Sequence, residues 1–270
     1  MLAKTLSGAV IGVDGLIVRV EVDLALGLPN FSTVGLAEGA VRESKDRVRA
    51  AIKNSGYEFP PRRITVNLAP AAVKKEGAGY DLPIALGILA ASGLLTNPNF
   101  SHTAVVGELS LDGTVRPVLG VLPMVLEAKA NKIQRFLVPA DNAHEAAVIQ
   151  GIEIIPIERL AQAVEYFAGQ LAIEPARTDV DALFSGRCEY PVDFSEVRGQ
   201  AHVKRAFEVA AAGGHNLLLS GVPGTGKTMM ARRLPTILPD LCLSEAVETT
   251  KIYSTTGLLP QNLPLMVIRP

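Results

Sequence analysis

The sequence predicts an α/β protein with two regions joined by a linker. Strand and helix patterns interleave over residues 1–169, the periodicity stops over 170–192, and a glycine-rich loop near residue 225 lies between an apolar run and a helix pattern. The 270 residues, of which 48% are hydrophobic and 20% charged, are enough for two cores. We therefore expect domains at 1–169 and 193–270 with a linker at 170–192.

The first region opens with a predicted β-hairpin. Apolar and charged residues alternate from Leu16 to Leu24, after a turn signal at 13–15. Residues 38–55 show the apolar face of a helix, and Asp81 is placed to cap a second helix that reaches residue 95. Further strands are expected at 4–11, 64–68, 105–111, 136–138 and 152–155, and further helices at 123–131, 140–149, 158–168, 200–212 and 244–251.

Residues 221–228 form a complete G-x-x-x-x-G-K-[ST] phosphate-binding loop. The apolar run at 216–220 predicts a buried strand before it, and 229–234 predicts a helix after it. Glycine permits the turn that points backbone N–H groups at a phosphate, and a helix start favours negative charge. We expect Lys227 to reach the β- and γ-phosphates of ATP and the Thr228 hydroxyl to bind Mg²⁺. The predicted ATP-binding residues are Gly221, Val222, Pro223, Gly224, Thr225, Gly226, Lys227 and Thr228.

A P-loop ATPase also needs acidic residues, at the end of a later strand, that hold Mg²⁺ and polarise water. No apolar run that ends in Asp-Asp or Asp-Glu follows Thr228. The sequence therefore predicts that the nucleotide domain is truncated at Pro270. We expect this part of the domain to bind ATP but not to hydrolyse it by itself. We assign no catalytic residue here beyond Lys227.

The composition excludes several classes of protein. A net charge of −1 produces no bulk field for nucleic acid or membrane, so any such surface must be local. The two cysteines, Cys188 and Cys242, form no C-x-x-C pattern, which argues against a metal site or disulfide framework. The apolar stretch from 85 to 95 is too short to span a bilayer, and charges interrupt the N-terminal apolar run. We expect a cytoplasmic protein.

Two stretches resemble known families. Residues 193–200 and 211–219, followed by the phosphate loop, resemble the start of the AAA+ domain in magnesium-chelatase-like ATPases. Residues 74–83 (KKEGAGYDLP) and 107–117 (GELSLDGTVRP) resemble the Lon-protease-type domain that precedes it in the ComM/YifB family. The matches span nearly the whole chain, and their combination is more specific than either alone.

The resemblance implies a bacterial motor that assembles as a hexameric ring and acts on single-stranded or branched DNA without reading its sequence. Members of the ComM type drive branch migration during recombination of transforming DNA. The acidic Mg²⁺ pair, sensors and arginine fingers would lie beyond Pro270. One alternative is a chelatase-type ATPase that remodels a metal-inserting complex, although such subunits lack the Lon-like extension. A second is that this chain is only a binding module.

The Lon-like region is predicted to lack the Ser-Lys dyad of active Lon-type domains, in which a lysine takes the proton of the serine nucleophile. The serine position of the family pattern falls on Gly79, and the lysine position falls on Leu122. Ser92 or Ser110 could replace the serine, but no lysine is spaced to activate either. We therefore expect a binding or assembly module rather than a peptidase.

Basic residues concentrate between positions 42 and 75. On the predicted helix, Arg42, Lys45, Arg49 and Lys53 fall within a stripe of about 80°, which could contact DNA phosphates without reading bases. The alternative is a solvated helix face supported by i,i+4 ion pairs. Because aromatic residues are scarce here, base stacking is not predicted. The other basic residues of this run are Arg47, Arg62, Arg63, Lys74 and Lys75.

Overall fold

The computed structural model describes residues 1–36, 39–95, 98–185, 190–260 and 263–270. The chain forms two compact units, which are described separately. The first unit comprises Met1–Asp179 with Thr250–Pro264, and the second comprises Val180–Thr249 with Leu265–Pro270. The domain ranges expected from the sequence stay a prediction.

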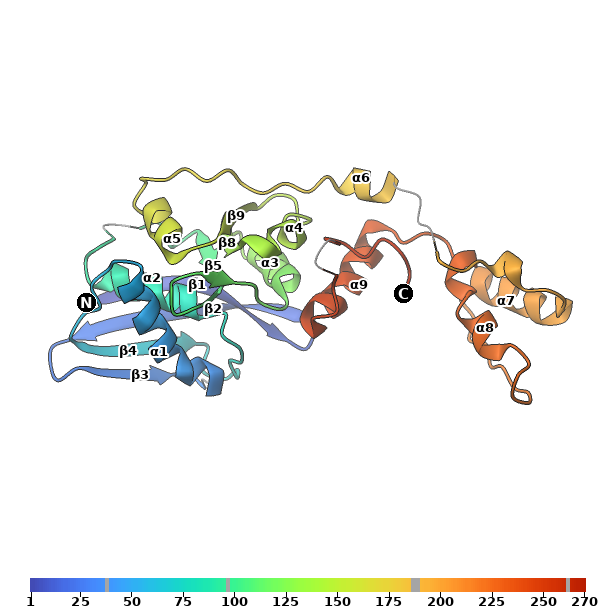
Figure 1. Ribbon diagram of the computed structural model, residues 1–270, viewed down its shortest axis with the longest axis horizontal. Helices are drawn as coiled ribbons and strands as arrows, with labels where there is room; N and C mark the ends of the chain where they lie inside the picture. Colours follow the sequence, from blue (N-terminus) through green and yellow to red (C-terminus); the bar gives the residue numbers. More distant parts are fainter. Residues whose placement is uncertain (37–38, 96–97, 186–189, 261–262) are drawn as a thin grey trace. The chain divides into compact units, whose positions relative to one another are not determined.

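A seven-stranded sheet forms the centre of the first unit, with strand order β3-β4-β2-β1-β5-β8-β9 (Figure 1). β1 and β2 form the predicted antiparallel hairpin, and β4 is antiparallel to β2. The other four neighbouring pairs are parallel. The strands are β1 (Leu2–Ile11), β2 (Asp14–Ala25), β3 (Asn30–Val34), β4 (Arg63–Ala69), β5 (Thr103–Val105), β8 (Arg135–Pro139) and β9 (Glu153–Ile157), and a separate ribbon pairs β6 (Glu108–Leu109) with β7 (Val115–Arg116).

Helices cover both faces of this sheet. A Cβ at Gly87 of α2 would lie 2.7 Å from Val22 Cγ2, and a Cβ at Gly8 of β1 would lie 2.8 Å from the Met124 side chain of α3. Because Val22 and Gly8 point to opposite faces along the hairpin register, α2 and α3 lie on opposite sides. The helices are α1 (Gly39–Asn54), α2 (Asp81–Ala91), α3 (Val121–Ala130), α4 (Ala143–Ala146) and α5 (Leu160–Phe167), with a 3₁₀ turn η1 (Ala140–Asn142) before α4.

Asp81 does not cap its helix as predicted. It is the first residue of α2 and fully buried, and its carboxylate accepts two hydrogen bonds from the Arg47 guanidinium, at 2.7 and 3.1 Å. The Leu109 N–H also donates to it at 3.3 Å. Burial raises the pKa of Asp81 to about 6 although Arg47 and Leu109 act in the opposite direction. Its role is therefore to join α1, α2 and β6.

Helix α9 (Leu243–Thr256) is longer than the helix predicted at 244–251, and its last residues belong to the first unit. The Ser254 hydroxyl donates to the buried Glu145 carboxylate, and the Gly120 N–H donates to the Ser254 carbonyl at 3.2 Å. Lys251 pairs with Asp14 at 2.6 Å. The C-terminal end of α9 is thus anchored on the loop before α3.

Within the described residues of the second unit, the regular secondary structure is helical and loops join the helices. It contains α6 (Val180–Ser185), η2 (Phe194–Glu196), α7 (Ala201–Gly213), α8 (Lys227–Ala231), η3 (Leu234–Ile237) and the start of α9. A small core joins η2, α7 and α8, and the Phe194 and Phe207 rings lie 5.7 Å apart. Its buried residues are Phe194, Val197, Phe207 and Met230.

The strand predicted at 216–220 does not form. Leu218 is 91% exposed and Leu217 38% exposed, while Leu219 packs on the edge of the core. A strand needs a neighbour to pair with its backbone N–H and C=O groups, and no strand is present among the described residues of this unit. The apolar run therefore has no regular secondary structure.

Candidate functional site

The phosphate loop leads directly into α8, as the sequence predicts. Gly224 and Gly226 both have φ of +84°, a conformation that glycine adopts without steric cost. A Cβ at Gly224 would meet no atom within 4 Å, so the loop faces open space. The Thr225 hydroxyl donates to the Val222 carbonyl at 3.0 Å and closes the turn.

Lys227 folds back over this loop. Its Nζ atom donates to the carbonyl oxygens of Gly221 at 2.7 Å and Val222 at 2.8 Å, and it lies 3.4 Å from the Thr225 hydroxyl. These partners are surface groups that water or phosphate oxygens can replace. The amine is therefore held where a triphosphate tail in the loop would meet it.

Two contacts fix the position of the loop. The Gln200 side chain, at the start of α7, donates to the Thr225 carbonyl at 3.3 Å. Met230 of α8 is buried in the core beside Phe207. The base of the loop is thus tied to α7 on one side and to the core on the other.

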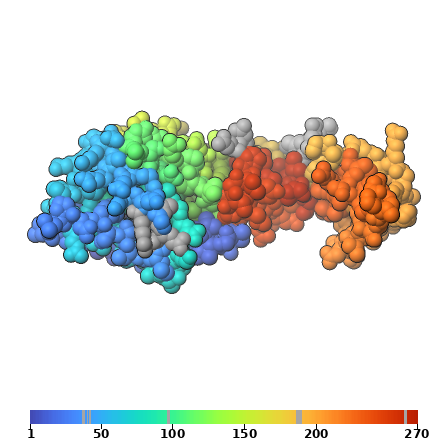
Figure 2. Space-filling view, turned by 60° about the horizontal axis from the view of Figure 1, so that its bottom comes forward, coloured from blue at the N-terminus to red at the C-terminus, as the bar shows by residue number. Residues whose placement is uncertain are grey.

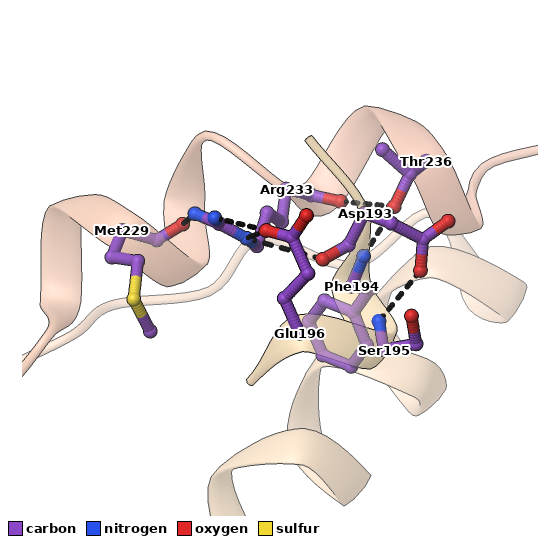
Figure 3. Close-up of polar contacts among 7 residues, drawn as sticks. All are labelled: Asp193, Phe194, Ser195, Glu196, Met229, Arg233 and Thr236. Atoms are coloured by element: carbon purple, nitrogen blue, oxygen red, sulfur yellow. Dashed lines mark hydrogen bonds and ion pairs between the residues drawn. The ribbon is translucent and has the colours of Figure 1, made fainter. Parts of the chain in front are cut away.

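Arg233 joins the segment after α8 to η2, and the sequence analysis did not identify it (Figure 3). Its Nε atom donates to the Asp193 carbonyl and to the Glu196 carboxylate, each at 3.1 Å. Its Nη1 atom donates to the Met229 carbonyl at 3.0 Å. The fork of an arginine can serve such divergent acceptors, whereas a lysine cannot. An arginine one turn after the loop is a common surface residue, so the sequence alone gives no signal for this role.

Neighbouring contacts complete the join between η2 and η3. The Phe194 N–H donates to the Thr236 hydroxyl at 3.1 Å, and the Thr236 hydroxyl donates to the Arg233 carbonyl at 2.8 Å. The Asp193 carboxylate accepts from the Ser195 N–H at 2.7 Å, and hydrogen bonds from Ser195 hold the pKa of Asp193 below its usual range (Figure 3). The stretch that starts at Asp193 is therefore held against the segment that follows the C-terminal end of α8.

The loop residues fit the tail of ATP, since the glycines leave space and the Lys227 amine lies over the loop. Thr228 is exposed at the first turn of α8, where its hydroxyl can reach a metal ion bound to phosphate. Within the described ranges, no group of three or more His, Cys, Asp or Glu side chains could hold a metal ion alone. Among the described residues, Thr228 is the candidate ligand for Mg²⁺.

Gly79, the serine position of the Lon-like pattern, lines a cavity of about 860 Å³ in the first unit together with Glu108 and Met124. A Cβ at Gly79 would lie 3.1 Å from Val106 Cγ2, so the site of the family serine is closely packed. Leu122 is fully buried, and its N–H donates to Glu145 at 3.1 Å.

Neither alternative serine is paired with a lysine in the described part of the chain. The Ser92 hydroxyl donates to the Leu89 carbonyl at 2.8 Å, and the Ser110 hydroxyl accepts from Arg116. Lys75 is fully buried, burial lowers its pKa, and its amine donates to the Pro70 carbonyl. At these positions no serine hydroxyl is therefore paired with a lysine amine that could take its proton.

The structure keeps most of the predicted basic stripe. Lys45, Arg49 and Lys53 are exposed on α1, whose residues are light blue in Figure 2 and form part of the visible surface. Arg42 lies in α1, but its side chain is outside the described residues. Two of the nine basic residues do not belong to this surface, because Lys75 is buried and Arg47 pairs with Asp81.

Comparison with known families finds two matches. Residues 20–142 match the family described as subunit ChlI of Mg-chelatase, and residues 193–270 match magnesium chelatase, subunit ChlI.

Individual relatives cover nearly all of the chain. An uncharacterised protein of Mycobacterium tuberculosis is 43% identical over 269 residues, which are 100% of this chain and 53% of that protein. Competence protein ComM of Haemophilus influenzae is 42% identical over 257 residues, 94% of this chain and 50% of the relative. YifB of Escherichia coli is 44% identical over 247 residues, which are 91% of this chain and 48% of YifB. The chain thus spans about half the length of these relatives.

A more distant similarity supports the predicted fold. Lon protease of Rhizobium meliloti is 25% identical over 166 residues, 57% of this chain and 20% of the protease. Together with the mostly parallel sheet, this confirms an α/β chain in which a Lon-like region precedes the start of a P-loop region. No described helix has both the length and the apolar character needed to cross a membrane.

Proposed function

We propose that this chain, which belongs to the magnesium-chelatase ChlI family and resembles ComM and YifB, is part of an ATP-driven DNA motor. The motor is of the ComM type, acts in the cytoplasm and promotes branch migration during recombination of transforming DNA. The observation that carries the proposal is the complete phosphate loop with the Lys227 amine held over it. The 42% identity to competence protein ComM supports the assignment to the ComM type.

In this proposal the loop residues from Gly221 to Thr228 bind the phosphates of ATP, and the Thr228 hydroxyl holds the accompanying Mg²⁺. Lys227 exchanges its loop carbonyl partners for phosphate oxygens. ATP supplies the energy that moves subunits of a hexameric ring along DNA. Because the chain spans about half of its relatives, we assign hydrolysis and ring assembly to a chain of their full length.

We further propose that the Lon-like region, residues 1–169, has no peptidase activity. This rests on Gly79 and Leu122 at the dyad positions and on the pairing of Ser92 and Ser110 described above. Incubating the purified chain with a fluorescent casein tests it. Proteolysis that disappears in a Ser92→Ala or Ser110→Ala variant would contradict the proposal.

A second candidate is an ATPase that remodels a metal-inserting partner, because both family descriptions name magnesium chelatase. The sequence argument against it was that chelatase subunits lack the Lon-like extension. The match at residues 20–142 carries the chelatase description itself, so this region does not separate the two functions.

The native gene product decides between the two candidates. We expect its ATPase rate to rise on forked or three-stranded DNA and its ATP hydrolysis to drive strand exchange on a three-stranded substrate. Porphyrin and a partner complex should leave the rate unchanged. Stimulation by porphyrin without any response to DNA would contradict the motor proposal and support the chelatase-type function.

A further inference from the structure

A groove of about 430 Å³ lies in the first unit between the end of α1 and the starts of β3 and β4. Lys45, Arg49 and Lys53 line it from α1, and Arg62 lines it from the segment before β4. Its volume is within the range of pockets that enclose small organic groups. Residues on three elements thus build one concave surface around the predicted basic stripe.

The electrostatics of the groove favour an anion. All four cations are exposed, and Asp46 is the carboxylate that stands against them among the described lining residues. Lys45, Arg49 and Lys53 follow each other at intervals of four residues, so the row extends about 12 Å along the helix. A linear row of cations matches a linear polyanion better than a single small anion.

The floor of the groove is apolar and partly aromatic. Phe31 at the start of β3 and Phe59 before β4 line it, and both are half-buried. The guanidinium carbon of Arg49 lies over the Phe59 ring, 5.6 Å from its centre, so a cation stands above one aromatic face. The scarcity of aromatic residues in the sequence predicts no base stacking here, and two aromatic rings nevertheless line this groove.

We propose that this groove binds single-stranded DNA, with phosphates on the row of cations and one base against the aromatic floor. An unpaired base of a single strand can enter such a groove, whereas the bases of a duplex are stacked inside the double helix and cannot reach it. An acidic peptide would satisfy the cations but would present no planar ring to Phe59. The inference rests on the proposed function only in its choice of DNA as the polyanion.

The test measures binding by fluorescence anisotropy, with a labelled oligo(dT) of fifteen nucleotides and a labelled abasic strand of the same length. We expect the chain to bind oligo(dT) at least about 5-fold more tightly than the abasic strand, since one stacked base contributes about 1–3 kcal/mol. A Phe59→Leu variant should lose that preference while binding the abasic strand as before.

Charge reversal tests the phosphate contacts. The double change Arg49→Glu and Lys53→Glu should weaken binding at least about 10-fold and reduce the slope of log Kd against log salt by about 1.4. Arg177→Glu makes the same type of change at an exposed residue outside the groove and should have little effect. Footprinting by lysine acetylation checks the wild-type chain directly, because oligo(dT) should protect Lys45 and Lys53 but not Lys129.

Four results would overturn the groove proposal: no binding at low salt, equal binding of the abasic strand, an equal loss in Arg177→Glu, or full competition by polyglutamate. The test is separate from that of the motor, because Lys227→Ala should bind oligo(dT) normally in the absence of ATP. If the protein binds oligo(dT) but does not bind ATP, the motor proposal is contradicted and the groove proposal is not. If the protein shows ATP-driven activity on DNA but oligo(dT) does not protect Lys45 and Lys53, the groove proposal is contradicted and the motor proposal is not.

Discussion

Two glycine-containing loops, each followed by a helix, differ in what supports them and in what they carry. The loop at Gly77–Tyr80 lies on the sheet unit and is fixed by backbone hydrogen bonds, such as Gly107 N–H to Gly79 carbonyl at 2.9 Å. The loop at 221–228 has the lysine and threonine that ATP requires, yet the run before it is unpaired and Leu218 is exposed. The lysine and threonine of the phosphate loop therefore lie outside the sheet unit.

In the division of roles that we propose, the second unit binds the nucleotide, and the first unit is a packed scaffold that carries the DNA groove. Substitutions in the two units should accordingly have separable effects. Changes in the core of the first unit should alter its stability, changes in its groove should alter DNA binding, and changes in the second unit should alter nucleotide binding.

The largest effect is expected for Lys227→Ala. Removing the amine eliminates charge-assisted hydrogen bonds to phosphate, so Mg·ATP affinity should fall by about 100-fold or more. Isothermal titration calorimetry measures this, with Lys204→Ala of α7 as a matched control that should bind normally. Retention of affinity in Lys227→Ala would show that ATP binds elsewhere.

Gly15→Ala should damage the scaffold without touching the loop. A Cβ at this position would lie 2.1 Å from the Pro123 carbonyl oxygen, so the hairpin and α3 must separate. We expect the free energy of unfolding of the first unit to fall by about 3 kcal/mol. Urea denaturation followed by circular dichroism measures the change. Gly39→Ala, at a position of the same unit where a Cβ would meet no atom within 4 Å, is the control and should leave this transition nearly unchanged.

The buried Asp81 gives the scaffold a pH dependence. Its pKa rises from 3.8 to about 6 on folding, so the folded state favours the protonated carboxyl and becomes relatively less stable as pH rises. The stability of wild type minus that of Asp81→Asn should therefore drop by up to about 3 kcal/mol between pH 4 and roughly 6.5. Urea titrations of both proteins at several pH values measure this difference. A difference that stays flat or rises over this range would contradict the shift.

The smallest effect is expected for Arg233→Lys, which keeps the charge but loses the forked contacts with Asp193 and Glu196. We expect Mg·ATP affinity to fall by about 3- to 10-fold through loss of positioning, since each such hydrogen bond contributes roughly 1 kcal/mol. Calorimetry gives the affinity. Arg232→Lys, at the preceding position, is the control. An equal loss of affinity in that variant would contradict the special role of Arg233.

Much of the first unit could be predicted because its pattern is local. The alternation in β2 and the apolar face of α1 appear in the sequence, and both elements form close to the expected bounds. β3 was missed because its five residues at the edge of the sheet are only partly buried or exposed and do not alternate. The role of Asp81 was predicted wrongly, because its partner Arg47 lies 34 residues away and local capping rules do not see it.

In the second unit the loop could be predicted from its residues, but its surroundings could not. The three leucines at 217–219 suggest a buried strand, but a strand depends on neighbours elsewhere in the chain. The Arg233 contacts likewise join segments about 40 residues apart. Local chemistry was therefore predictable, while long-range pairing was not.

The most direct measurement is photolabelling of the native gene product with Mg²⁺ and an azido derivative of ATP, followed by mass spectrometry of its peptides. The proposed division of roles predicts that the label lies in peptides from 193 to 238 and that excess ATP removes it. Label that excess ATP displaces from peptides of the first unit, with none at 193–238, would contradict it.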